Sequence, residues 1–128
     1  MLSALLVASA AVPRSPESYF RQFLGTDPPP SVQVIQHYYR RGFGNHSWAI
    51  AFTVDPSEFD AVVSRYPFVR TRLAEGEEPL ISAGLAARLD APMAYRYSYE
   101  EPGPGGGLIV HVYSSADHGT VYARGGFD

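Results

Sequence analysis

The fold is decided by the stretch Ser47-Trp48-Ala49-Ile50-Ala51-Phe52-Thr53-Val54. Large apolar side chains alternate there with small ones, and a period of two residues is typical of a β-strand. One face of this strand therefore carries Trp48, Ile50 and Phe52 into the core. The small residues on the other face predict a second layer that packs closely there, such as a helix.

A helix and a second strand are predicted before this stretch. Ser15-Pro16-Glu17 is a helix start, with a capping serine, a proline at the first helical position and an acid at the positive end of the dipole; Gly25 can end the helix. Residues 32–40 are rich in β-branched and aromatic residues, which indicates a strand. Because Gly42 and Gly44 mark a turn, the two strands should form a hairpin.

Further helices and strands are predicted after it. Asp55-Pro56-Ser57-Glu58 is a second helix start, and Pro67 limits that helix. Apolar residues at a spacing of four permit a third helix over residues 81–89. In the last third of the chain, residues 93–99 alternate as a strand does, residues 108–114 are predicted to be a partner strand, and residues 120–124 permit a third.

The composition fits one folded domain. The chain has 128 residues, of which 45% are hydrophobic and 18% charged, and these proportions are typical of globular rather than disordered proteins. We therefore predict a single α+β domain over residues 15–128. Its expected architecture is an antiparallel sheet of four to five strands in two hairpins, with two or three helices packed on one face.

Two missing residue types exclude several kinds of chemistry. The chain has no cysteine, which excludes disulfides, thiolate zinc sites and cysteine nucleophiles. All ten of its basic residues are arginine, so a lysine-dependent phosphate loop and Schiff-base chemistry are excluded as well. We expect no cofactor. The net charge of −3 argues against nucleic acid as a partner.

The N-terminal residues 1–14 are predicted to be a signal peptide or an N-terminal apolar segment. They are rich in small and apolar residues, and Ala8-Ser9-Ala10 has the form of a secretory cleavage site, although no basic residue precedes the apolar run. We therefore expect a periplasmic or secreted protein, with a cytoplasmic one as the alternative. No stretch approaches the roughly 20 apolar residues of a membrane span, so no span is expected.

The candidate catalytic residues are His111, Asp117 and His118. A neutral imidazole can act as a general base oriented by a carboxylate, and two histidines with a carboxylate can ligate zinc or iron. Their spacing specifies neither chemistry, because His111 falls on a strand and His118 in the turn after it. The structural alternative is a half-buried strand histidine followed by a polar turn, without any metal site.

The candidate binding residues at the first hairpin are Tyr38, Arg40, Arg41 and Phe43. Mixtures of aromatic residues and arginine mark the hot spots of protein interfaces, and also occur where single-stranded nucleic acid binds. The structural alternative is a hairpin end with solvated arginines and tyrosines in the core.

Tyr97 is a further candidate binding residue, at the centre of the stripe Tyr95, Tyr97 and Tyr99. Tyrosine combines an apolar ring with a polar tip, which suits a groove for a peptide or a carbohydrate. The structural alternative is a sheet face that a helix covers.

No motif identifies a function, so three hypotheses remain open. We expect first an exported binding or interaction domain without catalytic activity, which holds a protein partner through its aromatic residues or its Arg40-Arg41 hairpin end. The second hypothesis is a histidine-based or metal-dependent hydrolase that uses His111, Asp117 and His118. The third is a cytoplasmic immunity-type inhibitor that neutralises a toxin. The sequence leaves the oligomeric state open.

Overall fold

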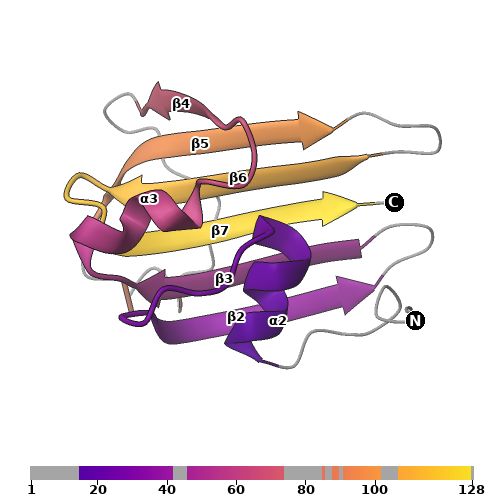
Figure 1. The fold of residues 1–128 in the computed structure, drawn as a ribbon, viewed down its shortest axis with the longest axis horizontal. Helices are drawn as coiled ribbons and strands as arrows, with labels where there is room; N and C mark the ends of the chain where they lie inside the picture. The colour runs from indigo at the N-terminus through magenta and orange to yellow at the C-terminus, as the bar shows by residue number, and fades with distance from the viewer. Residues whose placement is uncertain are drawn as a thin grey trace.

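The computed structural model describes residues 15–41, 46–73, 85, 88–89, 91–101 and 107–127. Its centre is one antiparallel sheet of six strands in the order β2-β3-β7-β6-β5-β4 (Figure 1). The strands are β2 (Gln33–Arg41), β3 (His46–Thr53), β4 (Val69–Arg72), β5 (Met93–Glu101), β6 (Leu108–Ser115) and β7 (Thr120–Phe127).

Two helical segments precede β2 and β4. The first is α2 (Pro16–Tyr19), which continues as the π-helical turn η1 (Phe20–Leu24). The second is the 3-10 turn η2 (Pro56–Glu58), which continues as α3 (Phe59–Val62). Across the described part of the chain, no helix is both long and apolar enough to cross a lipid bilayer.

The predicted fold class is wrong in its counts of strands and helices. The sheet has six strands instead of four to five, and the described residues form two short helical segments instead of two or three packed helices. The strand that sequence patterns missed is β4. It contains one apolar residue, Val69, and all four of its residues are exposed, so it has no buried face to produce an alternating pattern.

The predicted third helix, over residues 81–89, lies mostly outside the described residues. Of its apolar positions, Leu85 is helical and only 6% exposed. Leu85 belongs to a cluster of buried side chains, and Leu89 packs against that cluster.

The connections make the sheet a hairpin joined to a meander. Every pairing of neighbouring strands but one joins strands that follow each other among the described elements. The exception is β3 with β7, which runs from Thr53 opposite Thr120 to His46 opposite Phe127. The strand that the sequence marks most clearly, β3, therefore lies inside the sheet, beside the last strand of the chain (Figure 1).

Both helical segments lie over the same face of the sheet, which we call the helix face (Figure 1). The ring of Phe23 stacks on the indole of Trp48, with centroids 4.5 Å apart and planes at 5°. Gly125 leaves space for this indole, because a Cβ there would lie 2.8 Å from Trp48 Cζ2. The fully buried large side chains of this core are Tyr19, Phe20, Phe23, Leu24, Trp48, Ile50, Phe52, Phe59, Val62, Val110, Val112 and Val121.

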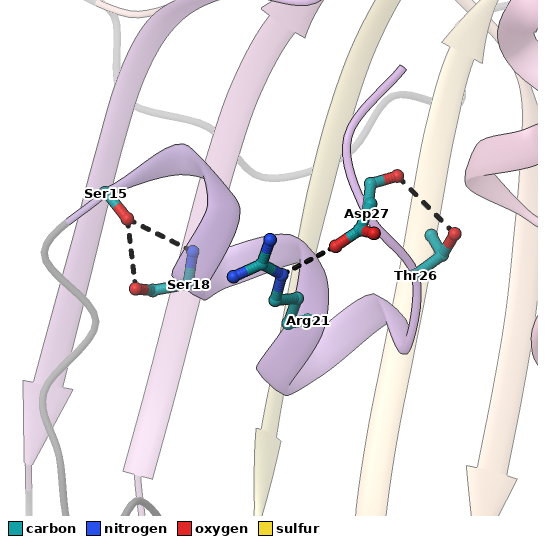
Figure 2. Close-up of polar contacts among 5 residues, drawn as sticks. All are labelled: Ser15, Ser18, Arg21, Thr26 and Asp27. Atoms are coloured by element: carbon teal, nitrogen blue, oxygen red, sulfur yellow. Dashed lines mark hydrogen bonds and ion pairs between the residues drawn. The ribbon is translucent and has the colours of Figure 1, made fainter.

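Side-chain contacts fix the first helical segment (Figure 2). Ser15 Oγ accepts a hydrogen bond from the Ser18 amide at 3.3 Å, as expected of a capping serine. The predicted helix start is thus confirmed. At the other end Arg21 Nε donates to Asp27 Oδ1 at 2.6 Å. Both side chains are more than half exposed, so this ion pair adds little stability.

The opposite face of the sheet, which we call the far face, has a smaller core. Ala49 and Ala51 of β3 are buried there, in contact with a cluster that includes Leu85 and Met93. Leu85, which lies outside the strands, belongs to this cluster, so a side chain packs closely on the face of these small residues as predicted. Tyr113 and Tyr122 complete it from β6 and β7.

Candidate functional site

The structure does not bring His111 and His118 together. On β6, Val110 and Val112 point into the core of the helix face, so His111 between them points to the far face. Its Nδ1 lies 3.0 Å from Ser98 Oγ. His118 lies in the β6–β7 turn, and its ring contacts Phe59 on the helix face.

Asp117 is engaged by the turn that contains it. Its Oδ1 accepts hydrogen bonds from Ser115 Oγ at 2.7 Å and from the Gly119 amide at 2.9 Å. These two bonds hold the pKa of the Asp117 carboxyl below its usual value. Asp117 therefore has the role that aspartate commonly has in turns.

The histidines of the described chain each pair with a hydroxyl group. The pairs are His37 with Tyr19, His46 with Tyr39, His111 with Ser98 and His118 with Tyr97. Within the described residues, no three histidine or acidic side chains come together in a way that could hold a metal ion.

His118 has an unusual backbone and a confined ring. Its φ of 64° is left-handed, which costs a residue with a Cβ roughly 1–2 kcal/mol. The ring is stacked on Tyr95, with centroids 5.3 Å apart and planes at 13°, and its centroid is 4.5 Å from that of Phe59. Its Nε2 lies 3.0 Å from the Tyr97 hydroxyl. These contacts hold the imidazole in place and offset the strain of the turn.

Two arginines of the edge strand β4 extend this group of aromatic residues. Arg70 lies opposite Tyr97 on β5, and Arg72 lies opposite Tyr95. The guanidinium carbons of Arg70 and Arg72 are 5.6 Å and 5.9 Å from the centroid of the Tyr95 ring. We call Arg70, Arg72, Tyr95, Tyr97 and His118 the Arg–Tyr–His cluster.

The two arginines of this cluster have no ion-pair partner within the described part of the chain. Both arginines are exposed, and no carboxylate among the described residues forms an ion pair with either of them. Burial raises the pKa of Tyr97. The hydrogen bond with Arg70 lowers this pKa, and the charge of Asp60 raises it. Tyr97 therefore keeps its proton at neutral pH, and the cluster presents two cations.

One side of the β4 backbone faces no other described strand. The Leu73 amide donates to the Ala94 carbonyl on the β5 side at 2.9 Å. Since backbone groups alternate in direction along a strand, the N–H and C=O groups of Arg70 and Arg72 point away from β5. No further strand follows β4 in the sheet of the described residues, and Val69 is 66% exposed. The two arginines thus offer both charge and unpaired backbone groups.

The candidate residues of the first hairpin point to different faces. Tyr38 and Arg40 lie on the far face, and Tyr38 is 46% exposed. Arg41 alternates onto the helix face, opposite His46. Phe43 lies outside the described residues. Tyr97 belongs to the Arg–Tyr–His cluster, at the other end of the sheet.

Sequence reasoning missed Arg70 and Arg72. A weak signal was present, because Val69-Arg70-Thr71-Arg72 places two arginines on one side of an extended segment. Comparison of the chain with protein-family models, with curated proteins and with solved structures found no match.

Proposed function

We propose that this chain is a binding domain that captures an extended acidic segment of a protein partner along the edge of β4. One observation carries the proposal. Arg70 and Arg72 hold their guanidinium groups over the Tyr95 ring, and their backbone N–H and C=O groups face an edge where no further described strand lies. No described carboxylate forms an ion pair with either arginine. A segment that adds to a sheet edge as a new strand satisfies such backbone groups.

The geometry of strand addition defines the partner sequence. Residues directly opposite Arg70 and Arg72 in an added strand are two positions apart and share the helix face. Acidic residues at those positions form charge-assisted pairs with the guanidiniums. The residue between them lies on the far face beside Val69 and Thr71, where a β-branched side chain fits. The partner motif is therefore acid–x–acid, with x β-branched.

The ring of Tyr95 prepares the two arginines for binding. Contacts between the ring and the guanidiniums limit the freedom of two long side chains before a partner arrives. His118 in turn fixes the Tyr95 ring from the β6–β7 turn. Pre-ordering of this kind reduces the entropy lost on binding.

The same charges disfavour pairing of β4 with a second copy of itself. An antiparallel β4–β4 contact would bring arginines of the two copies close together, and like charges across neighbouring strands are destabilising. Edge arginines therefore select against self-association and for acidic strands.

A hydrolase that uses His111, Asp117 and His118 has less support. The imidazoles of His111 and His118 lie on opposite faces of the sheet, and Asp117 is occupied by its turn. Binding needs no such convergence.

The test is the affinity for a fluorescent peptide in which glutamate alternates with threonine or valine. Its control is a peptide of the same composition with the glutamates in one block. The double variant Arg70→Glu/Arg72→Glu should weaken binding of the alternating peptide by about tenfold or more, because two attractions become repulsions. The matched control is Arg40→Glu/Arg41→Glu, which should bind as the wild type does.

Three outcomes count against the proposal. Equal binding of the two peptides would show attraction by charge alone. Unchanged binding by Arg70→Glu/Arg72→Glu would remove β4 from the site. Loss of binding in Arg40→Glu/Arg41→Glu only would place the site at the first hairpin instead.

A further inference from the structure

Three cationic or protonatable side chains lie side by side on the far face, away from the Arg–Tyr–His cluster. They come from β5, β6 and β7, which are neighbours in the middle of the sheet (Figure 1). His111 of β6 lies opposite Arg124 of β7, and on its other side it lies opposite Ser98 of β5. Arg96 lies two residues before Ser98, diagonally across from His111. Such neighbours are within reach of one another's side chains.

Arg96 lacks the partner that a partly buried guanidinium needs. Its Nε is buried and has no hydrogen-bond partner in the described structure. A buried polar group without a partner is costly, and most such groups in folded proteins are paired. Arg96 and Arg124 both act electrostatically on His111, with Glu100 as the acid that acts in the opposite direction. The unpartnered Nε of Arg96 therefore favours an acceptor from outside the described chain.

A depression with both apolar and acidic lining residues begins next to these residues. It has a volume of about 290 Å³ and is lined by the base of the β5–β6 hairpin: Glu100, Glu101, Gly107, Leu108 and Ile109. Ile109 is 40% exposed and lies two residues before His111, on the same face. Gly126 lies opposite Ile109 and has no side chain, so β7 places no side chain beside Ile109 on this face.

We infer that Arg96 and His111, with the positive charge of Arg124 beside them, bind the carboxylate or phosphate head of a small organic anion, whose apolar part extends over Ile109 into the depression beside it. The guanidinium of Arg96 matches either head group, because its planar N–H donors pair with two oxygens. A ligand of this kind supplies the missing acceptor for Nε. The site lies on the face opposite the contacts of Arg70 and Arg72 with Tyr95, so it is independent of the proposed capture of an acidic strand.

The test follows amide and imidazole NMR signals of the full chain during titration with inorganic phosphate, acetate and hexanoate. Saturable shifts at His111 and at its β5 and β7 neighbours are expected with at least one head group, and the phosphate and carboxylate arms show which one. If a carboxylate binds, hexanoate should bind about tenfold more tightly than acetate, because its added methylenes leave water for the depression.

Two single variants assign the site. Arg96→Met should weaken binding of the preferred anion by about tenfold or more. Arg65→Met removes the same charge at an exposed position on another part of the surface, and it should bind as the wild type does. Arg96→Lys keeps the charge without the planar donors and should bind at an intermediate strength. It serves in place of Arg96→Met should the spectrum of that variant show unfolding.

The inference is overturned by either of two results. One is the absence of saturable shifts with phosphate, acetate and hexanoate. The other is binding that Arg96→Met or Arg96→Lys retains in full, or that Arg65→Met loses equally. The acidic-peptide affinity of folded Arg96→Met should stay unchanged, which separates a failure here from a failure at β4.

Discussion

The ring of Tyr95 is stacked on the imidazole of His118, with ring centroids 5.3 Å apart and planes at 13°. This contact joins the β6–β7 turn to the edge of the sheet, because Arg70 and Arg72 lie over the same tyrosine ring. A residue in a left-handed turn thus helps to position two arginines from a different part of the chain. The cluster gives the edge strand a defined arrangement of charge.

Substitution of His118 should separate the strain of its backbone from the contacts of its ring. Both His118→Ala and His118→Gly remove the ring, but only alanine keeps a Cβ in the left-handed conformation at φ 64°. We expect His118→Gly to be more stable than His118→Ala by about 1 kcal/mol. Urea unfolding of the two variants measures this difference. Equal stabilities would mean that the turn relaxes when the ring is lost.

The stability of the fold should depend on the protonation of His111. Burial lowers the pKa of His111, the guanidiniums of Arg96 and Arg124 lower it further, and Glu100 raises it. The unfolded chain, with an ordinary histidine pKa of about 6.5, therefore takes up this proton more readily than the folded chain. The contribution of neutral His111 is complete above that pH and is lost as the pH falls toward the folded pKa.

The measurement is the free energy of unfolding in urea between about pH 7.5 and about pH 5.5. This free energy should decrease in the wild type as the pH is lowered. It should decrease less steeply in His111→Gln, which cannot take up the proton. Equally steep curves would assign the loss to other groups. Asp117, whose pKa is also lowered, contributes in a separate window below about pH 4.

Two adjacent serines should respond differently to replacement by alanine. Ser114 Oγ is buried and has no hydrogen-bond partner in the described structure. Ser115 Oγ donates to Asp117 and accepts from the Thr120 amide at 3.0 Å. Ser114→Ala should leave the free energy of unfolding unchanged or raise it by up to about 1 kcal/mol, whereas Ser115→Ala should lower it by about 1–3 kcal/mol.

Chemical denaturation of the two serine variants provides the comparison. A loss of stability in Ser114→Ala as large as that in Ser115→Ala would show that the Ser114 hydroxyl has a partner after all.

The sequence predicted those parts of the fold that carry a buried face. The alternation of residues 47–54 identified β3 and the burial of Trp48, Ile50 and Phe52, and all three are fully buried. The strands β2, β5, β6 and β7 were also predicted, because their segments are rich in β-branched or aromatic residues. The strand β4 has no such face, and therefore its position at the edge of the sheet could not be predicted from periodicity.

The candidate sites show a similar limit. Nearness in sequence suggested that His111 and His118 act together, but a strand directs alternate side chains to opposite faces, and the turn brings His118 to the helix face. Tyr97 was identified as a candidate binding residue, whereas Arg70 and Arg72 were not. Their contact with Tyr95 depends on the register between β4 and β5, which no local pattern specifies.

Amide hydrogen exchange of β4, with and without the alternating acidic peptide, tests the central claim most directly. The amides of Arg70 and Arg72 point away from β5 and should exchange fast in the free protein, whereas those of Val69 and Thr71 already bond to β5. A saturating peptide should slow exchange at Arg70 and Arg72 specifically. Unchanged exchange at these two amides with the peptide bound, or protection only at the opposite edge strand β2, would contradict strand addition at β4.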